Sequence, residues 1–226
     1  MIVAIDGPAG SGKSTVAEGV ARRRGYQLVD TGAMYRAVAF EALRRDVDLE
    51  DGAAVAELAR QLDFEFRFDG DDNVVFCNGV RLDEQIRRNE VSRAASIVSA
   101  HPSVRKVLVQ TQRGVGENRS SVLEGRDIGT VVFPDADVKV FITATPEERA
   151  RRRAAQLREQ GEEVRFEEVL SEIEQRDRRD TERETAPLKK ADDAVEIVTD
   201  DMTVQEVIGR VDELVEKSVE KSDSGE

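Results

Sequence analysis

The chain has 226 residues, of which 39% are hydrophobic and 36% charged, and its formal net charge is −13. This length suits one large domain with a real core, and the plentiful apolar residues exclude wholesale disorder. The single cysteine, Cys77, excludes an internal disulfide framework and suits a reducing cytoplasm. No apolar run approaches the roughly 20 residues of a membrane span, so we expect a cytoplasmic protein without a membrane partner.

The first predicted elements alternate between strand and helix. Residues 2–6 form a short apolar run before a Gly-rich turn, which predicts a buried parallel strand. Residues 11–25 then predict a helix that is closed by its last glycine. A second strand at 26–30, a second helix at 31–45 and a third helix at 49–62 follow. This alternation indicates an α/β fold with a central parallel sheet.

The pattern changes near residue 63. Residues 63–82 alternate apolar and polar side chains with a period of two, and the polar run at 69–73 interrupts them. This predicts an antiparallel hairpin that is extended by a short third strand. Because it breaks the α/β rhythm, we expect an inserted, β-rich subdomain over about 63–98. Cys77 takes an apolar position in the hairpin, which favours packing over chemistry.

The remainder returns to the first pattern. A helical stretch runs through residue 117, and residues 120–144 predict buried strands around a tight Gly-Arg-Asp-Ile-Gly-Thr loop. Residues 146–183 are polar and helical, with a break at a glycine. A last strand precedes a closing helix, for which Thr203 is the expected N-cap. We expect residues 220–226 to be a disordered tail.

Residues 7–14 match the pattern G-x-x-x-x-G-K-[ST] in full, with a strand before and a helix after. In such a loop, backbone N–H groups and the helix N-terminus surround phosphate oxygens. The lysine reaches the β and γ phosphates, and the hydroxyl of Ser14 would ligate Mg²⁺. The alternative, an ordinary glycine-rich turn, is disfavoured by this context. The predicted ATP-binding residues are Gly7, Pro8, Ala9, Gly10, Ser11, Gly12, Lys13, Ser14 and Thr15.

The loop leaves the type of triphosphate-using protein open. A GTPase needs a switch glycine after an acidic residue and an N-K-x-D guanine reader, and the sequence has neither. An ATP-driven motor would be larger. A small phosphotransferase needs instead a second anion pocket and a lid that keeps water from the triphosphate.

Two segments could build the second anion pocket. Thr31 and Gly32 begin the second predicted helix and Arg36 follows one turn later, so a hydroxyl, a helix end and a guanidinium could surround one anion. A capped helix with a surface arginine is the alternative. Arg126 and Asp127 follow a predicted strand, which places them at the carboxyl edge of the sheet, where α/β folds bind ligands. A tight structural turn is the alternative there.

Residues 149–183 hold 10 arginines and 10 acids within an acidic protein. Such a run is often only a solvated helix with surface ion pairs. However, Arg176, Asp180 and Arg183 are spaced at i, i+4 and i+7, which predicts one shared helix face. Two guanidiniums beside a carboxylate could hold transferring phosphates and a ribose hydroxyl. Arg149 and Arg153 form a similar pair at i and i+4.

Together these motifs resemble the bacterial cytidylate kinases, the nucleoside monophosphate kinases that phosphorylate CMP and dCMP with ATP. The resemblance spans nearly the whole chain, from IDGPAGSGKST and DTGAMYRAVA through AASIVSAHPSVRKVLVQTQR to the Arg-rich segment. The segments GRDIGTVVFPDA and RDRRDTERETAPL are its most specific parts. The resemblance implies a P-loop three-layer fold, phosphate transfer from ATP to CMP or dCMP in pyrimidine metabolism, and a Mg²⁺ cofactor.

The resemblance also implies a role for each matching position. Thr31, which is Ser in many relatives, would contact the phosphate or base region of CMP, and Asp30 would hold a Mg²⁺-bound water. The implied CMP-binding residues are Thr31, Tyr35, Arg36, Ser96, Arg105, Arg126, Asp127, Arg176, Asp180 and Arg183. Among these, Ser96, Arg105 and Asp127 would read cytosine and Asp180 the sugar hydroxyl. The implied catalytic residues are Lys13, Arg126, Arg176 and Arg183.

The reading of cytosine has a physical basis. Cytosine offers an N4 amino donor and N3 and O2 acceptors, so an acid with an Arg and a Ser complements it. Uracil would face Asp127 with O4 and no proton to share, and a site built for a hydrogen bond rejects the analogue that cannot form it.

The resemblance implies one P-loop kinase domain over residues 1–226. Its core would comprise about 1–62, 99–148 and 184–219, with the monophosphate-binding insert at about 63–98 and a helical lid at about 149–183. We expect a monomer that binds small nucleotides.

Two other interpretations stay open. A related small kinase could use UMP, dTMP, shikimate or a coenzyme precursor, although the Gly-Arg-Asp and Arg-Asp-Arg-Arg-Asp segments argue against it. A non-catalytic nucleic-acid-associated module would track a phosphate backbone with its arginines. No stacking platform accompanies them, since aromatic residues are only 4% of the chain and Trp is absent, so we expect no nucleic-acid partner.

Overall fold

The computed structural model describes residues 1–70, 72–82, 84–159 and 161–224. Its centre is a parallel sheet with the strand order β2-β6-β1-β7-β8. The strands are β1 (Ile2–Asp6), β2 (Gln27–Asp30), β6 (Ser121–Gly125), β7 (Val138–Thr143) and β8 (Val195–Val198). The sequence-based prediction of an α/β parallel sheet is confirmed.

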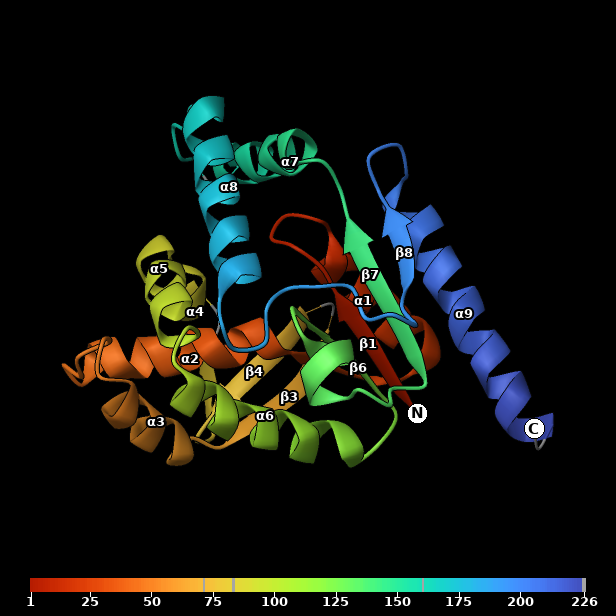
Figure 1. Cartoon of the computed structure of the whole chain (residues 1–226), viewed down its shortest axis with the longest axis horizontal. Coiled ribbons are helices and arrows are strands. Elements are labelled where there is room, and N and C mark those ends of the chain that lie inside the picture. Colours follow the sequence, from red (N-terminus) through yellow and green to blue (C-terminus); the bar gives the residue numbers. More distant parts are fainter. Residues whose placement is uncertain (71, 83, 160, 225–226) are drawn as a thin grey trace.

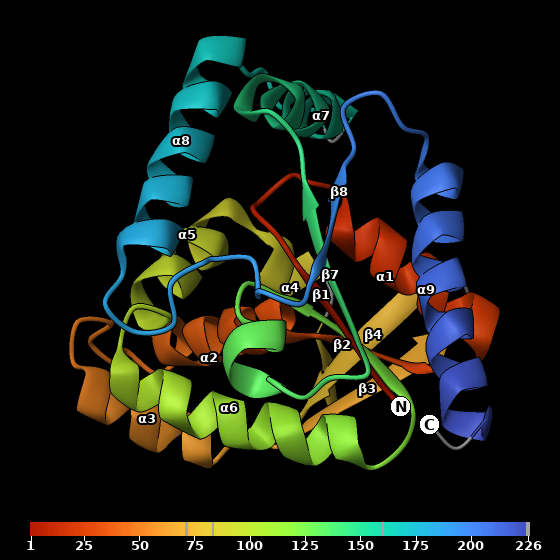
Figure 2. The ribbon, with the colours of Figure 1, turned by 45° about the vertical axis from the view of Figure 1, so that its right-hand side comes forward.

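Helices cover both faces of this sheet, which makes three layers (Figures 1 and 2). On one face lie α1 (Lys13–Arg24) and α9 (Val204–Ser224), and on the other lie α2 (Thr31–Arg44) and α6 (Pro102–Glu117). Alternate residues of β1 serve the two faces: Val3 and Ile5 pack with the α1 and α9 side chains, whereas Ala4 packs with the α2 and α6 side chains. This is the two-residue period of a strand buried on both sides.

The helix ends follow the predicted signals. Gly25 closes α1 in the left-handed conformation, with φ 66°, and its N–H donates to the carbonyl of Arg22. At the start of α9, the N–H of Glu206 donates to the hydroxyl of Thr203, while the Thr203 N–H donates to the Glu206 carboxylate. This capping box confirms the predicted cap.

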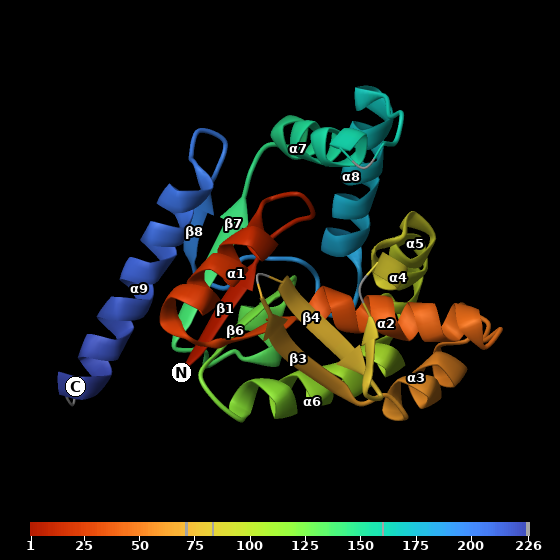
Figure 3. The same ribbon diagram turned by 180° about the vertical axis from the view of Figure 1, so that it is seen from behind.

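A small antiparallel sheet interrupts the α/β order, as predicted. Its strands are β3 (Phe64–Asp69), β4 (Asp72–Cys77) and β5 (Val80–Leu82), paired in that order. It follows α3 (Gly52–Arg60) and is followed by α4 (Glu84–Arg87) and α5 (Asn89–Val98). Seen from behind, β3 and β4 lie against α2 and α6 (Figure 3), and their buried side chains belong to the same core as those helices.

Two helices stand over the carboxyl ends of the central strands (Figure 1). They are α7 (Pro146–Glu159) and α8 (Phe166–Glu182), separated by a break in which Gly161 has φ 84°. Their apolar side chains form a separate small cluster centred on Ala150, Ala154, Val169 and Ile173. This helix pair therefore has its own core and meets the rest of the chain through polar contacts described below.

Two local predictions were wrong. The segment after Arg126 is no simple tight loop, because residues Ile128–Val132 form a π-helical turn. Both carboxylate oxygens of Asp6 accept hydrogen bonds at its start, from the N–H groups of Ile128 and Gly129 at 2.8 Å each. The expected disordered tail is helical through residue 224, and its last two residues lie outside the described part of the chain.

No helix among the described residues is long and apolar enough to cross a membrane.

Candidate functional site

The P-loop connects β1 to α1 at the carboxyl edge of the sheet. Gly12 caps α1 in the left-handed conformation, with φ 86°, and provides no side-chain acceptor. The N–H groups of the first turn of α1 therefore keep hydrogen-bonding capacity for an external anion. The structure thus places residues 7–15 in the strand–loop–helix setting that phosphate binding requires.

Lys13 lies inside this site and is 6% exposed. Its Nζ donates to the carbonyl of Pro8 at 3.3 Å and lies 4.0 Å from a carboxylate oxygen of Glu124. Burial, together with the positive charge of Arg126, lowers the pKa of Lys13 to about 7. A buried ammonium of this kind is held at a cost that bound phosphates would offset.

Glu124 is a functional candidate that the sequence interpretation missed. It is the penultimate residue of β6, just before the Gly-Arg-Asp segment, and it is buried. The Ser14 hydroxyl donates to its Oε2 at 2.8 Å. Burial and the nearby charge of Asp30 raise the pKa of Glu124. The available signal was an acid inside an otherwise apolar strand, at the end where ligands bind.

The start of α2 contributes a further cation, Arg36, to the site. The Asp30 carboxylate accepts the N–H of Ala33 at 2.9 Å and pairs with Arg36 Nη2 at 2.7 Å. Burial alone would raise the pKa of Asp30, but Arg36 and the Ala33 N–H outweigh burial and lower it. A Cβ built on Gly32 would lie 3.1 Å from Arg36 Nη1, so this guanidinium covers the start of the helix.

Thr31 is oriented differently from the prediction that its hydroxyl surrounds the anion. Its Oγ1 donates to the carbonyl of Glu124 at 2.7 Å, so it fastens α2 to β6. The helix end and Arg36 therefore remain together, and the hydroxyl is directed to the backbone.

Arg105 and Asp127 form a buried ion pair, 3% and 6% exposed, through Arg105 Nη2 and Asp127 Oδ2. Arg183 approaches the other carboxylate oxygen at 3.9 Å. The Arg105 guanidinium lies over the ring of Tyr35, 5.6 Å from its centroid. Ser96 is half-buried on α5, where its carbonyl accepts a hydrogen bond from the Ser99 hydroxyl. Four of the five residues therefore meet in one polar cluster.

A third group links α8 to the end of β6. Arg126 Nε donates to Asp180 Oδ2 at 3.0 Å. Burial, and then the charge of Arg126, lowers the pKa of Arg176 to about 10. Arg126 also lowers the pKa of Lys13, so these cations lie close to one another.

The prediction that Arg176, Asp180 and Arg183 share one helix face was wrong for Arg183. The helix ends at Glu182, and Arg183 has an extended backbone with ψ 138°. Its Nε donates to the carbonyl of Ala186 at 2.7 Å, and its Nη2 is directed to Asp127 as described. Arg183 thus reaches the cluster by leaving the helix.

Arg149 and Arg153 do not act as a pair. Arg149 is buried against the P-loop and Asp177. Arg153 donates to Gln156 at 2.9 Å and to Asn89 at 3.3 Å, on the side of α5. The one-turn spacing places them on the same side of α7 but gives them different partners.

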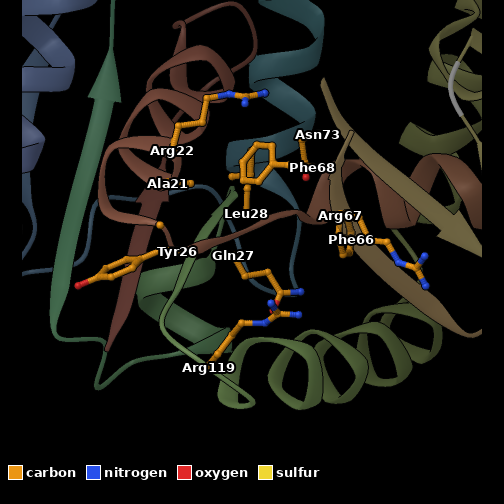
Figure 4. A pocket seen from close by; sticks show the side chains of 11 residues that line it. Ala21, Arg22, Tyr26, Gln27, Leu28, Phe66, Arg67, Phe68, Asn73 and Arg119 are labelled. Carbon is orange, nitrogen blue, oxygen red and sulfur yellow. The ribbon is translucent and has the colours of Figure 1, made fainter. Parts of the chain in front are cut away.

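A cavity of about 460 Å³ lies elsewhere, between α1, β2 and the β3–β4 hairpin (Figure 4). None of its 11 lining residues belongs to the predicted site. Arg22 at its rim is engaged by Glu18 at 2.9 Å and covers the ring of Phe68. The candidate site is instead the charged region at the carboxyl edge of the sheet.

Comparisons with known proteins show which sequences the chain resembles. A family model described as cytidylate kinase matches residues 3–217. A cytidylate kinase of Bacillus velezensis is 45% identical over 215 residues, which cover 95% of this chain and 96% of the relative. A cytidylate kinase of Geobacter sp. (strain M21) is 46% identical over 225 residues, which cover 100% of this chain and 97% of the relative.

Among solved structures, an uncharacterized protein from Eubacterium ventriosum matches with a TM-score of 0.50 at 13% identity, covering 96% of this chain and 98% of that one. At this identity the likeness concerns the fold alone.

Proposed function

The chain belongs to the cytidylate kinase family and is a kinase of CMP and dCMP, and we propose that the transfer takes place at the carboxyl edge of its parallel sheet. ATP is the phosphate donor and the P-loop is its site. The product pair is ADP with CDP or dCDP. We propose that the chain acts as a monomer.

The observation that carries this location is the convergence of cations. Lys13, Arg36, Arg126 and Arg176 come from four segments, and burial combined with mutual repulsion lowers the pKa of Lys13 and of Arg176. Cations are gathered this way where anions are to be bound, since the phosphates supply the missing counter-charge. The P-loop contributes Lys13 to this group, and Asp127, which pairs with Arg105, directly follows Arg126 in the chain.

The Arg105–Asp127 cluster suits the cytosine base. Asp127 has further acceptor capacity for the N4 amino group of cytosine, and Arg105 supplies donors for N3 and O2. Arg183 and Tyr35 complete the cluster, and Ser96 is our remaining candidate for base contact. Asp180, held by Arg126, is the candidate partner of the sugar hydroxyl.

The chemistry requires positioning more than proton transfer. An oxygen of the acceptor phosphate attacks the γ-phosphorus in line, the bond from that phosphorus to the β-phosphate oxygen breaks, and ADP leaves. A phosphate monoester is already anionic near neutral pH, so no general base is needed. Lys13, Arg126, Arg176 and Arg183 hold the phosphates and offset the charge that develops during transfer.

The helix pair α7–α8 is the proposed lid, over about residues 149–183. It stands over the carboxyl ends of the strands and carries Arg176 and Asp180 into the site. A lid of this kind excludes water, which would otherwise receive the phosphoryl group. The β-rich segment at about 63–98 is the proposed insert on the side of the monophosphate.

The residues present fit a magnesium ion. The Ser14 hydroxyl and the Glu124 carboxylate lie together at 2.8 Å beside the P-loop, and both offer oxygen, the donor that Mg²⁺ prefers. Few protein ligands are needed, because Mg²⁺ in such sites is completed by phosphates and water. When bound, the ion supplies positive charge to the triphosphate. Ser14 and Glu124 would hold it.

The proposal is tested by ADP release from ATP with five acceptors: CMP, dCMP, UMP, AMP and shikimate. We expect CMP and dCMP to give a kcat/KM at least about tenfold above the other three, because only cytosine complements Asp127. Equal rates with AMP or shikimate, or no CMP-dependent ADP release, would contradict the proposal.

A further inference from the structure

Arg149 joins three separate segments of the molecule. Its Nε donates to the carbonyl of Ala144, after β7, at 3.0 Å, and its Nη1 donates to the carbonyl of Ala9 in the P-loop at 3.2 Å. The same guanidinium forms a two-pronged pair with Asp177 on α8, at 3.0 and 2.6 Å. Arg149 itself is 3% exposed.

The guanidinium is therefore committed to the protein. All three of its nitrogens donate to protein acceptors, and a Cβ on Gly10 would lie 3.2 Å from the Arg149 Cβ. A side chain packed in this way against the outer part of the P-loop positions that loop. This differs from a phosphate ligand, which keeps its donors free for the substrate.

Asp177 occupies a critical place on α8. It directly follows Arg176, and Asp180 lies one turn further along the helix. The apolar contacts of α8 with α7 involve Val169 and Ile173, in its first half. The second half, which carries the site residues, is held by two ion pairs, Arg149–Asp177 and Arg126–Asp180.

We propose that Arg149 is a positioning residue that couples the P-loop to α8, so that ATP binding on one side orders Arg176 and Asp180 for CMP on the other. Phosphates bound to the P-loop N–H groups fix the conformation of the loop. The Ala9 carbonyl of that loop then fixes the Arg149 guanidinium, and the two-pronged pair with Asp177 fixes the orientation of α8. A two-pronged pair restrains rotation where a single hydrogen bond would not. This inference rests on the proposed function of the site.

The variant Asp177→Ala tests the coupling, because it removes the α8 arm and leaves the bonds to Ala9 and Ala144 in place. The measurement is the Kd of CMP by calorimetry, with and without a non-hydrolysable ATP analogue and Mg²⁺. In the wild-type enzyme we expect the analogue to tighten CMP binding about tenfold. In Asp177→Ala we expect a ratio near one, with kcat reduced about tenfold. The Kd of the ATP analogue without CMP should change by less than about twofold, whereas its Kd at saturating CMP should rise about tenfold, because the coupling is reciprocal.

Arg151→Ala is the matched control. Arg151 lies on α7, as Arg149 does, is exposed, and among the described residues pairs with Glu148 one turn away, so its loss should leave the CMP ratio as in the wild type. Asp177→Glu keeps the carboxylate and should restore part of the coupling. If Asp177→Ala does not fold, Arg149→Lys serves instead, since lysine keeps the positive charge but cannot form the two-pronged pair with Asp177.

Two results would overturn the inference even though CMP-dependent ADP release continued. One is that the folded Asp177→Ala enzyme retains the coupling, and the other is that the wild-type enzyme shows no coupling. Failure of the proposed function itself has a different signature, because the wild-type enzyme would then release no ADP with CMP.

Discussion

Individual buried charges dominate the site at the residue scale. Burial and neighbouring cations lower the pKa of both Lys13 and Arg176, which means that the site holds these charges at a cost to stability. Binding sites commonly carry such a cost, because the same groups become favourable when the ligand supplies the opposite charge. A substitution that removes one of these buried charges should therefore lower activity without lowering stability.

Replacing Lys13 with Met should therefore reduce turnover strongly without harming the fold. We expect kcat to fall by about 10³-fold, since the cation facing the phosphates is lost, and the Tm of the nucleotide-free enzyme at pH 7 to stay equal or rise. The measurements are ADP release with CMP and thermal unfolding by circular dichroism.

The difference in Tm between Lys13→Met and the wild type should depend on pH, because folding lowers the pKa of Lys13. The folded state holds the Lys13 pKa at about 7, below the ordinary 10.5, so the unfolded chain binds more protons between these values. The wild-type enzyme consequently gains stability as pH rises through this range, and the advantage of Lys13→Met should shrink toward about pH 10. A variant that is clearly less stable than the wild type at pH 7 would contradict this account.

At the level of secondary structure, the backbones of β1 and β7 approach each other closely at the start of the P-loop. Gly7 has φ 156°, and a Cβ built on it would lie 2.0 Å from the carbonyl oxygen of Ile142 on β7. That contact involves backbone on both sides, so neither partner can move away by changing rotamer. The close packing of β1 and β7 therefore depends on the absence of a side chain at the first residue of the loop.

Gly7→Ala should consequently destabilise the protein by about 2 kcal/mol or more, because the strands must separate. Gly114→Ala is the control: it lies within α6 with open space where its Cβ would be, and alanine there should add about 0.5–1 kcal/mol. Urea unfolding of both variants measures the difference. Equal stability of Gly7→Ala and the wild type would show that the strand contact is not tight.

Sequence patterns predicted the elements well where the cause is local. The strand–helix alternation, the P-loop, the hairpin and the Thr203 cap all depend on residues within a few positions of each other. The errors arose where a distant partner decides. Asp6 holds the π-helical turn from 122 residues away, and Ser14 meets Glu124 across 110 residues. Helical spacing also assumed that α8 continues to Arg183, although the helix ends one residue earlier.

At the scale of the whole molecule, net charge and local charge differ. The acids concentrate in residues 41–72, with 11 acids and 4 bases, and in residues 192–226, with 12 acids and 3 bases. Neither stretch contains a residue of the proposed site. The site arginines come from α2, α6, the end of β6 and α8, and they converge at one edge of the sheet. An overall charge of −13 is therefore compatible with two anionic substrates.

The ratio of kcat/KM for CMP to that for UMP measures whether the Arg105–Asp127 cluster selects cytosine. We compare the wild-type enzyme with Asp127→Asn, whose amide can donate to O4 of uracil. We expect the ratio to fall at least about tenfold in the variant, with the KM of ATP unchanged. An unchanged ratio in a folded Asp127→Asn enzyme would show that Asp127 does not select the base.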